Sequence, residues 1–266
     1  GGVKRSAWHL KKGIQSFEKF FGFKPSGCWP SEGSVSEQTI EQCAEYGFKW
    51  LASGETVLRN SMQKSAIDQQ HCIHTAYQLN ETETACFFRD DQLSDQIGFK
   101  YSNWHADDAV ANLVDSLEHI ALACHKHPAP IVSIILDGEN AWEYYPENGV
   151  FFLAALYKKL AEHKTINLTT YSDYLELQPA TRKLSSLVAG SWVYGSFSTW
   201  IGSADKNRAW DMLVDAKKAF DKTIKLNQLS EKEINTATTQ LATCESSDWF
   251  WWFGDYNPAE SVQAFD

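Results

Sequence analysis

Carboxylates that follow short apolar segments are the residues of this chain best placed to do chemistry. The charged residues at these segment ends are Glu32, Glu55, Arg89 with Asp90, and Asp137 with Glu139. Asp137, for example, directly follows Ile131–Leu136, a run of six apolar or small residues. Two carboxylates that meet in a cleft can break a glycosidic bond, because one ionised group attacks the anomeric carbon while a protonated one donates to the leaving oxygen. We therefore treat these residues as candidates for a sugar-cleaving site.

A single Asp or Glu after a strand also has an ordinary structural explanation. Such a residue usually caps the next helix or lies in its first turn, where the helix dipole stabilises the negative charge. The same arrangement at four segment ends, beside Gly, Ser and Trp, favours one shared site over four separate caps. For Glu32 and Glu139 both interpretations stay open, as contacts to sugar hydroxyls or as first-turn acids.

Tryptophan is abundant, at 11 of 266 residues. A pyranose ring presents an apolar C–H face that stacks on an indole, while its hydroxyls bond to polar groups nearby. Trp29 and Trp142 lie next to polar turn residues, and we predict that they are sugar platforms. Trp192 and Trp200 lie in the segment GSWVYGSFSTW, whose Gly and Ser residues offer indoles little local packing. For these two, platform and core interpretations both stay open.

The elements that must position these residues alternate along the chain. Apolar runs predict strands at Cys28–Trp29, at Phe48–Glu55, from Thr84 to Arg89, at Ile131–Leu136 and at Ile166–Thr170. Helical spacing predicts helices at 4–21, 36–46, 57–65, 105–125, 150–163 and 171–177. Such alternation is typical of an α/β fold with parallel strands and helices packed outside. The carboxyl ends of such strands open at one mouth, where ligands bind.

The strand pattern stops near Pro179, and residues 203–243 have helical periodicity. We therefore predict a partial barrel of parallel strands over residues 1–179 and a helical subdomain over residues 180–266.

Composition and charge exclude two classes of partner. The chain has a formal net charge of −10, and its Lys and Arg residues are scattered. An acidic surface repels phosphate backbones, so nucleic acid is not an expected partner. No run of 18 apolar residues is present, so we expect no membrane span.

The cysteines and histidines do not have the spacing of a metal site. Six cysteines without a CxxC pair favour buried free thiols in a reducing, cytoplasmic compartment. The histidine pairs His71 with His74 and His125 with His127 have no carboxylate at ligand spacing, and we predict that they are solvated loop residues. This argues against a metal-dependent polysaccharide deacetylase, which needs one Asp and two His ligands.

Three of these segments together resemble the conserved regions of one enzyme family. GCWPSEGSVSE, WLASGE and ILDGENAWEYYPENG are similar, in that order, to the second, third and fourth conserved regions of glycoside hydrolase family 57. The resemblance implies an incomplete (β/α)7 barrel followed by helices, and retaining action on α-glucans. It implies that Glu55 is the nucleophile and Asp137 the acid/base, with no cofactor. Arg89 is then a candidate cation beside Glu55, and we expect the pKa of Asp137 to be raised by burial, Trp142, Glu55 and Glu139.

The remaining candidates are expected to bind the sugar. They are Trp29, Glu32, Arg89, Asp90, Glu139, Trp142, Trp192 and Trp200. The segments FFRDDQLSDQIGFKYSNW, GSWVYGSFSTWIG and SDWFWWFGD are also similar to the amylase and amylopullulanase-like branch. The expected partner is an α-glucan oligosaccharide or polysaccharide, with hydrolysis and glucan transfer both open.

The chain departs from the family pattern in one place. The His-Gln-Pro stretch of the family's first region does not occur in it. We therefore expect a piece of a longer enzyme that lacks the first one or two barrel strands, which leaves sheet edges open for dimerisation. A second hypothesis is a carbohydrate-binding or regulatory module that kept the cleft and lost catalysis.

Overall fold

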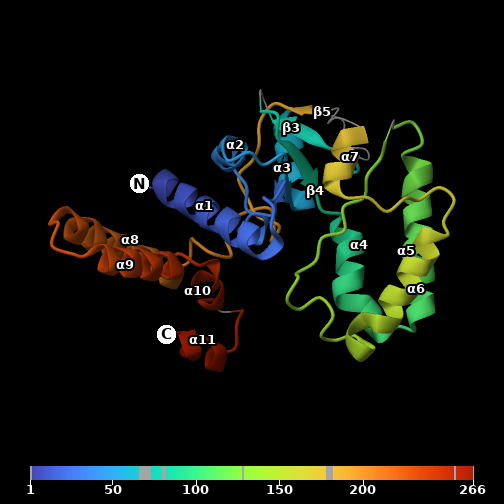
Figure 1. The fold of residues 1–266 in the computed structure, drawn as a ribbon. Helices are drawn as coiled ribbons and strands as arrows, with labels where there is room; N and C mark the ends of the chain where they lie inside the picture. Colours follow the sequence, from blue (N-terminus) through green and yellow to red (C-terminus); the bar gives the residue numbers. More distant parts are fainter. Residues whose placement is uncertain are drawn as a thin grey trace. The chain divides into compact units, whose positions relative to one another are not determined.

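The structure is a computed structural model that describes residues 2–65, 73–79, 82–127, 129–177, 182–254 and 256–265. The chain forms two compact units (Figure 1). One comprises Leu10–Gly195, and the other comprises Gly1–His9 with Ser196–Asp266. The predicted domain boundary between residues 179 and 180 lies outside the described residues.

The unit Leu10–Gly195 contains a mostly parallel sheet, which confirms the predicted fold class. In spatial order its strands are β1 (Gly27–Cys28), β2 (Trp50–Ser53), β4 (Ala85–Phe88), β3 (Tyr77–Leu79) and β5 (Arg182–Leu184). β1, β2 and β4 run parallel, and β3 runs parallel to β5. Only the pairing of β3 with β4 is antiparallel among the described strands. β3 was not predicted, because three residues in a polar stretch carry too little periodicity.

Two predicted strands are absent from the described part of the sheet. Ile131–Leu136 and Ile166–Thr170 form no strand there. The reason is visible for the first of them, because its backbone bonds to side chains and to the backbones of His74 and Asp90, which lie outside the described strands. The Ile135 N–H donates to Ser94 Oγ at 3.2 Å, and Arg89 Nε donates to the Ile135 carbonyl at 2.9 Å. This segment is therefore fixed beside the sheet without joining its ladder.

The helices of this unit lie close to the predicted places, apart from the short helix Asp91–Asp95, which the sequence did not predict (Figure 1). They are α2 (Glu37–Glu45), α3 (Glu55–Ser65), α4 (Asp91–Asp95), α5 (Ala106–Ala123), α6 (Val150–Ala161) and α7 (Tyr171–Leu177), with short turns η1 (Ser31–Gly33), η2 (Gln96–Lys100), η3 (Tyr101–Asn103) and η4 (Pro146–Gly149). Helix α1 (Gly2–Phe21) precedes them. α3 begins two residues earlier than predicted, so Glu55 lies in its first turn.

Apolar contacts hold these helices in place. Ile40 of α2, Leu51 of β2 and Leu58 of α3 belong to one buried cluster, so both helices pack on the sheet. A second cluster joins Leu113 of α5 to Phe152 of α6. β2 and β4 are almost entirely buried, as expected for strands covered on both faces.

The other unit is helical, with α8 (Ala204–Lys225), α9 (Glu231–Cys244), α10 (Ser247–Trp252) and α11 (Ala259–Phe265). Within it Arg5 pairs with Glu245 at 2.7 Å, and Trp210 stacks on Phe250 at 4.1 Å. No helix of the described residues has the length and apolar character to cross a membrane.

The cysteine prediction is only partly correct. Cys43, Cys86 and Cys124 are buried free thiols, but Cys244 is exposed. Cys72 lies outside the described residues.

Candidate active site

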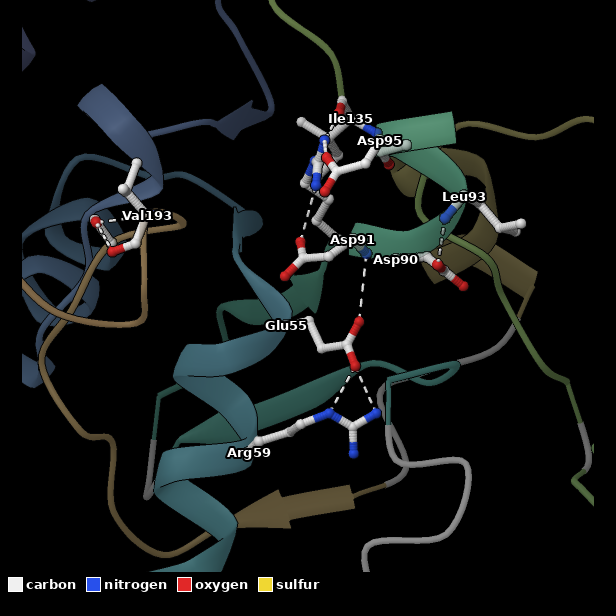
Figure 2. A network of polar contacts seen from close by, with 11 residues as sticks. Glu55, Arg59, Asp90, Asp91, Leu93, Asp95, Ile135 and Val193 are labelled. Carbon is white, nitrogen blue, oxygen red and sulfur yellow. Dashed lines mark hydrogen bonds and ion pairs between the residues drawn. The ribbon is translucent and has the colours of Figure 1, made fainter. Parts of the chain in front are cut away.

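Glu55 follows β2 after a single glycine and opens α3. Its Oε1 accepts a hydrogen bond from Arg59 Nε at 2.6 Å and pairs with Arg59 Nη2 at 2.5 Å. Its Oε2 accepts a hydrogen bond from the backbone N–H of Asp91 at 3.3 Å, just beyond β4 (Figure 2). The side chain is 16% exposed. A side chain of α3 and a backbone N–H just beyond β4 therefore hold both oxygens of a carboxylate that keeps some access to solvent.

Arg59, not Arg89, is the cation that contacts Glu55. Arg89 is nearly buried, and its Nη1 pairs with Asp91 Oδ1 at 3.0 Å while its Nη2 pairs with Asp95 Oδ1 at 2.7 Å. The expectation that Arg89 lies directly against Glu55 is thus corrected. Arg59 was missed because the predicted helix began after Glu55, which hid the spacing of four residues that brings two side chains together on a helix.

Asp91 links the two charged groups. Burial raises its pKa most, the contact with Arg89 opposes that rise, and the charge of Glu55 adds to it. Its backbone binds Glu55 and its side chain binds Arg89. The sequence signal for Asp91 was its place as the second of two acids directly after β4.

The predicted direction of the Asp137 pKa is confirmed. Burial raises the pKa of Asp137, and the charge of Glu139 raises it further, against smaller opposing effects of Asn140 and Arg89. Glu55 and Trp142, which were also expected to act, are not among these causes. A carboxyl group with a raised pKa keeps its proton to higher pH, as a general acid requires.

Trp142 packs with apolar residues. Its ring lies 5.3 Å from that of Tyr145 and 6.1 Å from that of Phe152. Gly149 has a φ of +83°, and a Cβ there would lie 3.0 Å from the Trp142 ring. Trp142 is half-buried in the cluster around α5 and α6.

Trp192 gathers several predicted residues around Glu55. Its Nε1 donates to Glu32 Oε2 at 3.2 Å, and its ring lies edge-on to Trp29 at 5.2 Å. The guanidinium of Arg89 lies 5.2 Å from the same ring. A Cβ on Gly54 would lie only 2.6 Å from the Trp192 backbone, so only glycine allows this close approach. Trp29, Glu32, Arg89 and Trp192 are therefore together next to Glu55.

The turn after Trp192 presents a further aromatic ring, which the sequence did not single out. Tyr194 is 81% exposed and has a φ of +57°, a strained value for a residue other than glycine. Gly195 lies against Thr56, and its carbonyl accepts a hydrogen bond from Asn60 Nδ2 at 3.4 Å. The turn is thus tied to the first turns of α3.

Two other predicted sugar contacts are buried. Asp90 is 5% exposed, and both of its carboxylate oxygens are engaged inside the fold. Trp200 is buried in the other compact unit, near Trp251. Glu139 is exposed on the turn after Asp137.

The histidine prediction is wrong for His74, which is buried at 7% exposure and contacts Asp90. His125 is exposed as predicted, and His71 lies outside the described residues. Within the described ranges, no three His, Cys, Asp or Glu side chains form a group that could hold a metal ion.

A family model matches most of the chain. The model for glycosyl hydrolase family 57 covers residues 4–187, which include every charged candidate described above. The chain belongs to glycosyl hydrolase family 57. A comparison with curated proteins gives no match.

Solved family 57 structures share this fold. A branching enzyme from Thermococcus kodakaraensis matches with a TM-score of 0.79 and 15% identity over 100% of this chain and 60% of that one. A branching enzyme from Pyrococcus horikoshii matches with 0.77 and 16%, over 98% of this chain and 59% of that one. The α-amylase AmyC from Thermotoga maritima matches with 0.72 and 14%, over 98% and 61%. The chain spans about 60% of the length of these proteins.

Proposed function

We propose that the chain carries the two catalytic carboxylates of a retaining enzyme that acts on α-glucans, with Glu55 as nucleophile and Asp137 as acid/base. The observation that carries the proposal is the setting of Glu55. Within a family 57 match, it stands at the carboxyl end of a buried parallel strand, with both oxygens held by Arg59 and by the Asp91 N–H. A fixed carboxylate at a strand end is suited to in-line attack on a bound sugar.

In the first step, a Glu55 oxygen attacks the anomeric carbon and forms a glycosyl ester. The bond to the glycosidic oxygen breaks, and Asp137 gives its proton to that oxygen. The raised pKa of Asp137 supports this role, because the proton is present at a pH where an ordinary carboxyl group has lost it.

In the second step, Asp137 accepts a proton from the incoming hydroxyl, and that oxygen displaces Glu55 from the anomeric carbon. Water as acceptor gives hydrolysis, and a sugar hydroxyl gives transfer. Branching enzymes and an α-amylase are among the similar structures, so both outcomes are part of the proposal.

Trp29, Glu32 and Trp192 are proposed to contact the sugar next to Glu55. Trp192 supplies a ring whose orientation is fixed by its bond to Glu32 and by the Arg89 guanidinium. An oriented indole can stack on a pyranose face at little entropic cost.

The test is turnover of soluble starch, pullulan and amylose by the unmutated chain, Glu55→Gln and Asp137→Asn. Reducing-sugar release reports hydrolysis, and the number of isoamylase-sensitive branches reports transfer. We expect either activity to fall about a thousandfold or more in both variants, because such carboxylates act as a unit. Binding of maltooligosaccharide without turnover in the unmutated chain would contradict the proposal and favour a non-catalytic carbohydrate-binding module.

A further inference from the structure

A buried histidine–carboxylate pair adjoins Asp91 of the candidate site. His74 Nε2 lies 3.1 Å from Asp90 Oδ2, and the two side chains are 9% and 7% exposed. Burying such groups is unfavourable unless they are paired and hydrogen-bonded, so their placement calls for a specific role. Because both side chains are buried, neither is exposed to a substrate.

The other carboxylate oxygen of Asp90 caps the N-terminus of α4. Asp90 Oδ1 accepts a hydrogen bond from the Leu93 N–H at 2.9 Å, which makes Asp90 the N-cap. Asp91 is the first residue of this helix, and its backbone N–H is the donor to Glu55 Oε2. The cap therefore orients the peptide group that contacts the proposed nucleophile (Figure 2).

The backbones of the same pair hold the segment that leads to Asp137. The Asp90 N–H donates to the Ser133 carbonyl at 2.9 Å, and the Ile131 N–H donates to the His74 carbonyl at 3.0 Å. The segment forms no described strand, so these bonds replace a sheet ladder. Asp137 lies four residues beyond Ser133.

Cys124 sets the orientation of the His74 ring. Its Sγ lies 3.7 Å from His74 Nδ1. Burial raises the pKa of the Cys124 thiol, against a smaller effect of Arg182, so the thiol keeps its proton and its S–H can donate a hydrogen bond to Nδ1. The ring then presents Nε2–H to Asp90. Contacts with Asp90 on one side and with the last turn of α5 on the other lock the imidazole in place.

We propose that His74 and Asp90 are positioning residues that hold, through one buried pair, the two segments carrying Asp91 and Asp137. This inference rests on the proposed roles of Glu55 and Asp137. Under this proposal Asp90 positions the catalytic groups and does not make the contact with the sugar that the sequence had led us to expect.

The test compares the unmutated chain with Asp90→Asn, His74→Ala and His74→Gln. Thr84→Val is the matched control, since Thr84 is also buried and donates to the Phe48 carbonyl at 3.0 Å, at the opposite end of β4. The first measurement is backbone amide hydrogen exchange in peptides covering 91–95 and 131–137. We expect exchange in both peptides to rise about tenfold or more in Asp90→Asn and His74→Ala, and to stay unchanged in Thr84→Val. Unchanged exchange in both peptides of both variants would overturn the proposal.

The second measurement is the kinetics on soluble starch. We expect kcat to fall about tenfold or more in Asp90→Asn, with KM within about twofold. His74→Gln, which keeps an N–H donor, should retain more activity than His74→Ala, and this pair of variants carries the test if Asp90→Asn does not fold. A raised KM with unchanged kcat would return Asp90 to substrate contact and overturn the proposal. If the unmutated chain has no turnover, the proposed function fails, and hydrogen exchange alone decides the positioning role.

Discussion

Arg59 binds the carboxylate of Glu55 from one helical turn further along α3. Its Nε and Nη2 both reach the same Glu55 oxygen, at 2.6 Å and 2.5 Å (Figure 2). The other oxygen is left to the Asp91 N–H. Arg59 therefore binds one oxygen of Glu55, and the other oxygen faces the end of β4. A solvated glutamate at a helix start would not have its two oxygens fixed in this way.

Replacing this arginine tests its role in orienting Glu55. Arg59 is 42% exposed, so the ion pair itself should stabilise the fold by only about 0.5 kcal/mol. We expect Arg59→Gln to lower kcat about tenfold while the free energy of unfolding changes by about that small amount. Arg59→Lys keeps the charge but cannot offer two nitrogens. Its kcat should lie between those of the unmutated chain and Arg59→Gln. Equal kcat in all three proteins would show that the carboxylate is positioned without Arg59.

The charge of Glu139 should set the upper pH limit of activity. Burial and then Glu139 raise the pKa of Asp137, and the general acid works only while it is protonated. Removing the negative charge in Glu139→Gln lowers the pKa of Asp137. The alkaline limb of the kcat/KM profile should therefore move to lower pH.

The control for this profile is Glu143→Gln. Glu143 is exposed nearby in the sequence but is not among the groups that act on Asp137. The same displacement in both variants, or no displacement in Glu139→Gln, would separate the alkaline limb from Asp137.

Gly54 should tolerate no side chain. An alanine Cβ would lie 2.6 Å from Trp192 Cα, and backbone on both sides leaves no flexible group to move. We expect Gly54→Ala to reduce the free energy of unfolding by about 2 kcal/mol and to reduce activity, because it displaces Trp192. Gly98→Ala, whose Cβ would meet nothing within 4 Å, should leave both nearly unchanged. Urea unfolding followed by tryptophan fluorescence measures the difference.

The backbone conformation of Tyr194 should lower the free energy of unfolding relative to a chain with glycine at this position. Its φ of +57° is unfavourable for a side chain that is 81% exposed and contributes little packing. We expect Tyr194→Gly to raise the free energy of unfolding by about 1 kcal/mol, less the entropy that glycine adds to the unfolded chain. A variant that unfolds more easily than the unmutated chain would show that the tyrosine ring stabilises the turn.

The sequence predicted best those features that depend on local pattern. Helical spacing placed α5 and α6 within a few residues, and apolar runs ending in acids placed β2 and β4. The rise in the pKa of Asp137 was also predicted, because burial and the neighbouring Glu139 are among its causes.

What the sequence could not predict depends on contacts between distant residues. His74 sits in a polar stretch that indicates a loop, and its burial comes from Asp90 and from Cys124, 50 residues away. Ile131–Leu136 has the composition of a strand, but its backbone bonds to the side chains of Ser94 and Arg89 and to backbone groups outside the described strands. Burial and pairing of this kind are set by tertiary structure, which overrides local preference.

The role of Glu55 can be tested most directly by trapping the glycosyl ester. A 5-fluoro-α-glucosyl fluoride gives a slow-turnover intermediate, because Glu55 displaces fluoride while the ring fluorine slows the second step. After digestion, mass spectrometry locates the added sugar. We expect a single 5-fluoroglucosyl adduct on Glu55, absent from Glu55→Gln. An adduct on Asp137 or Glu32, or none in a chain that cleaves starch, would contradict it.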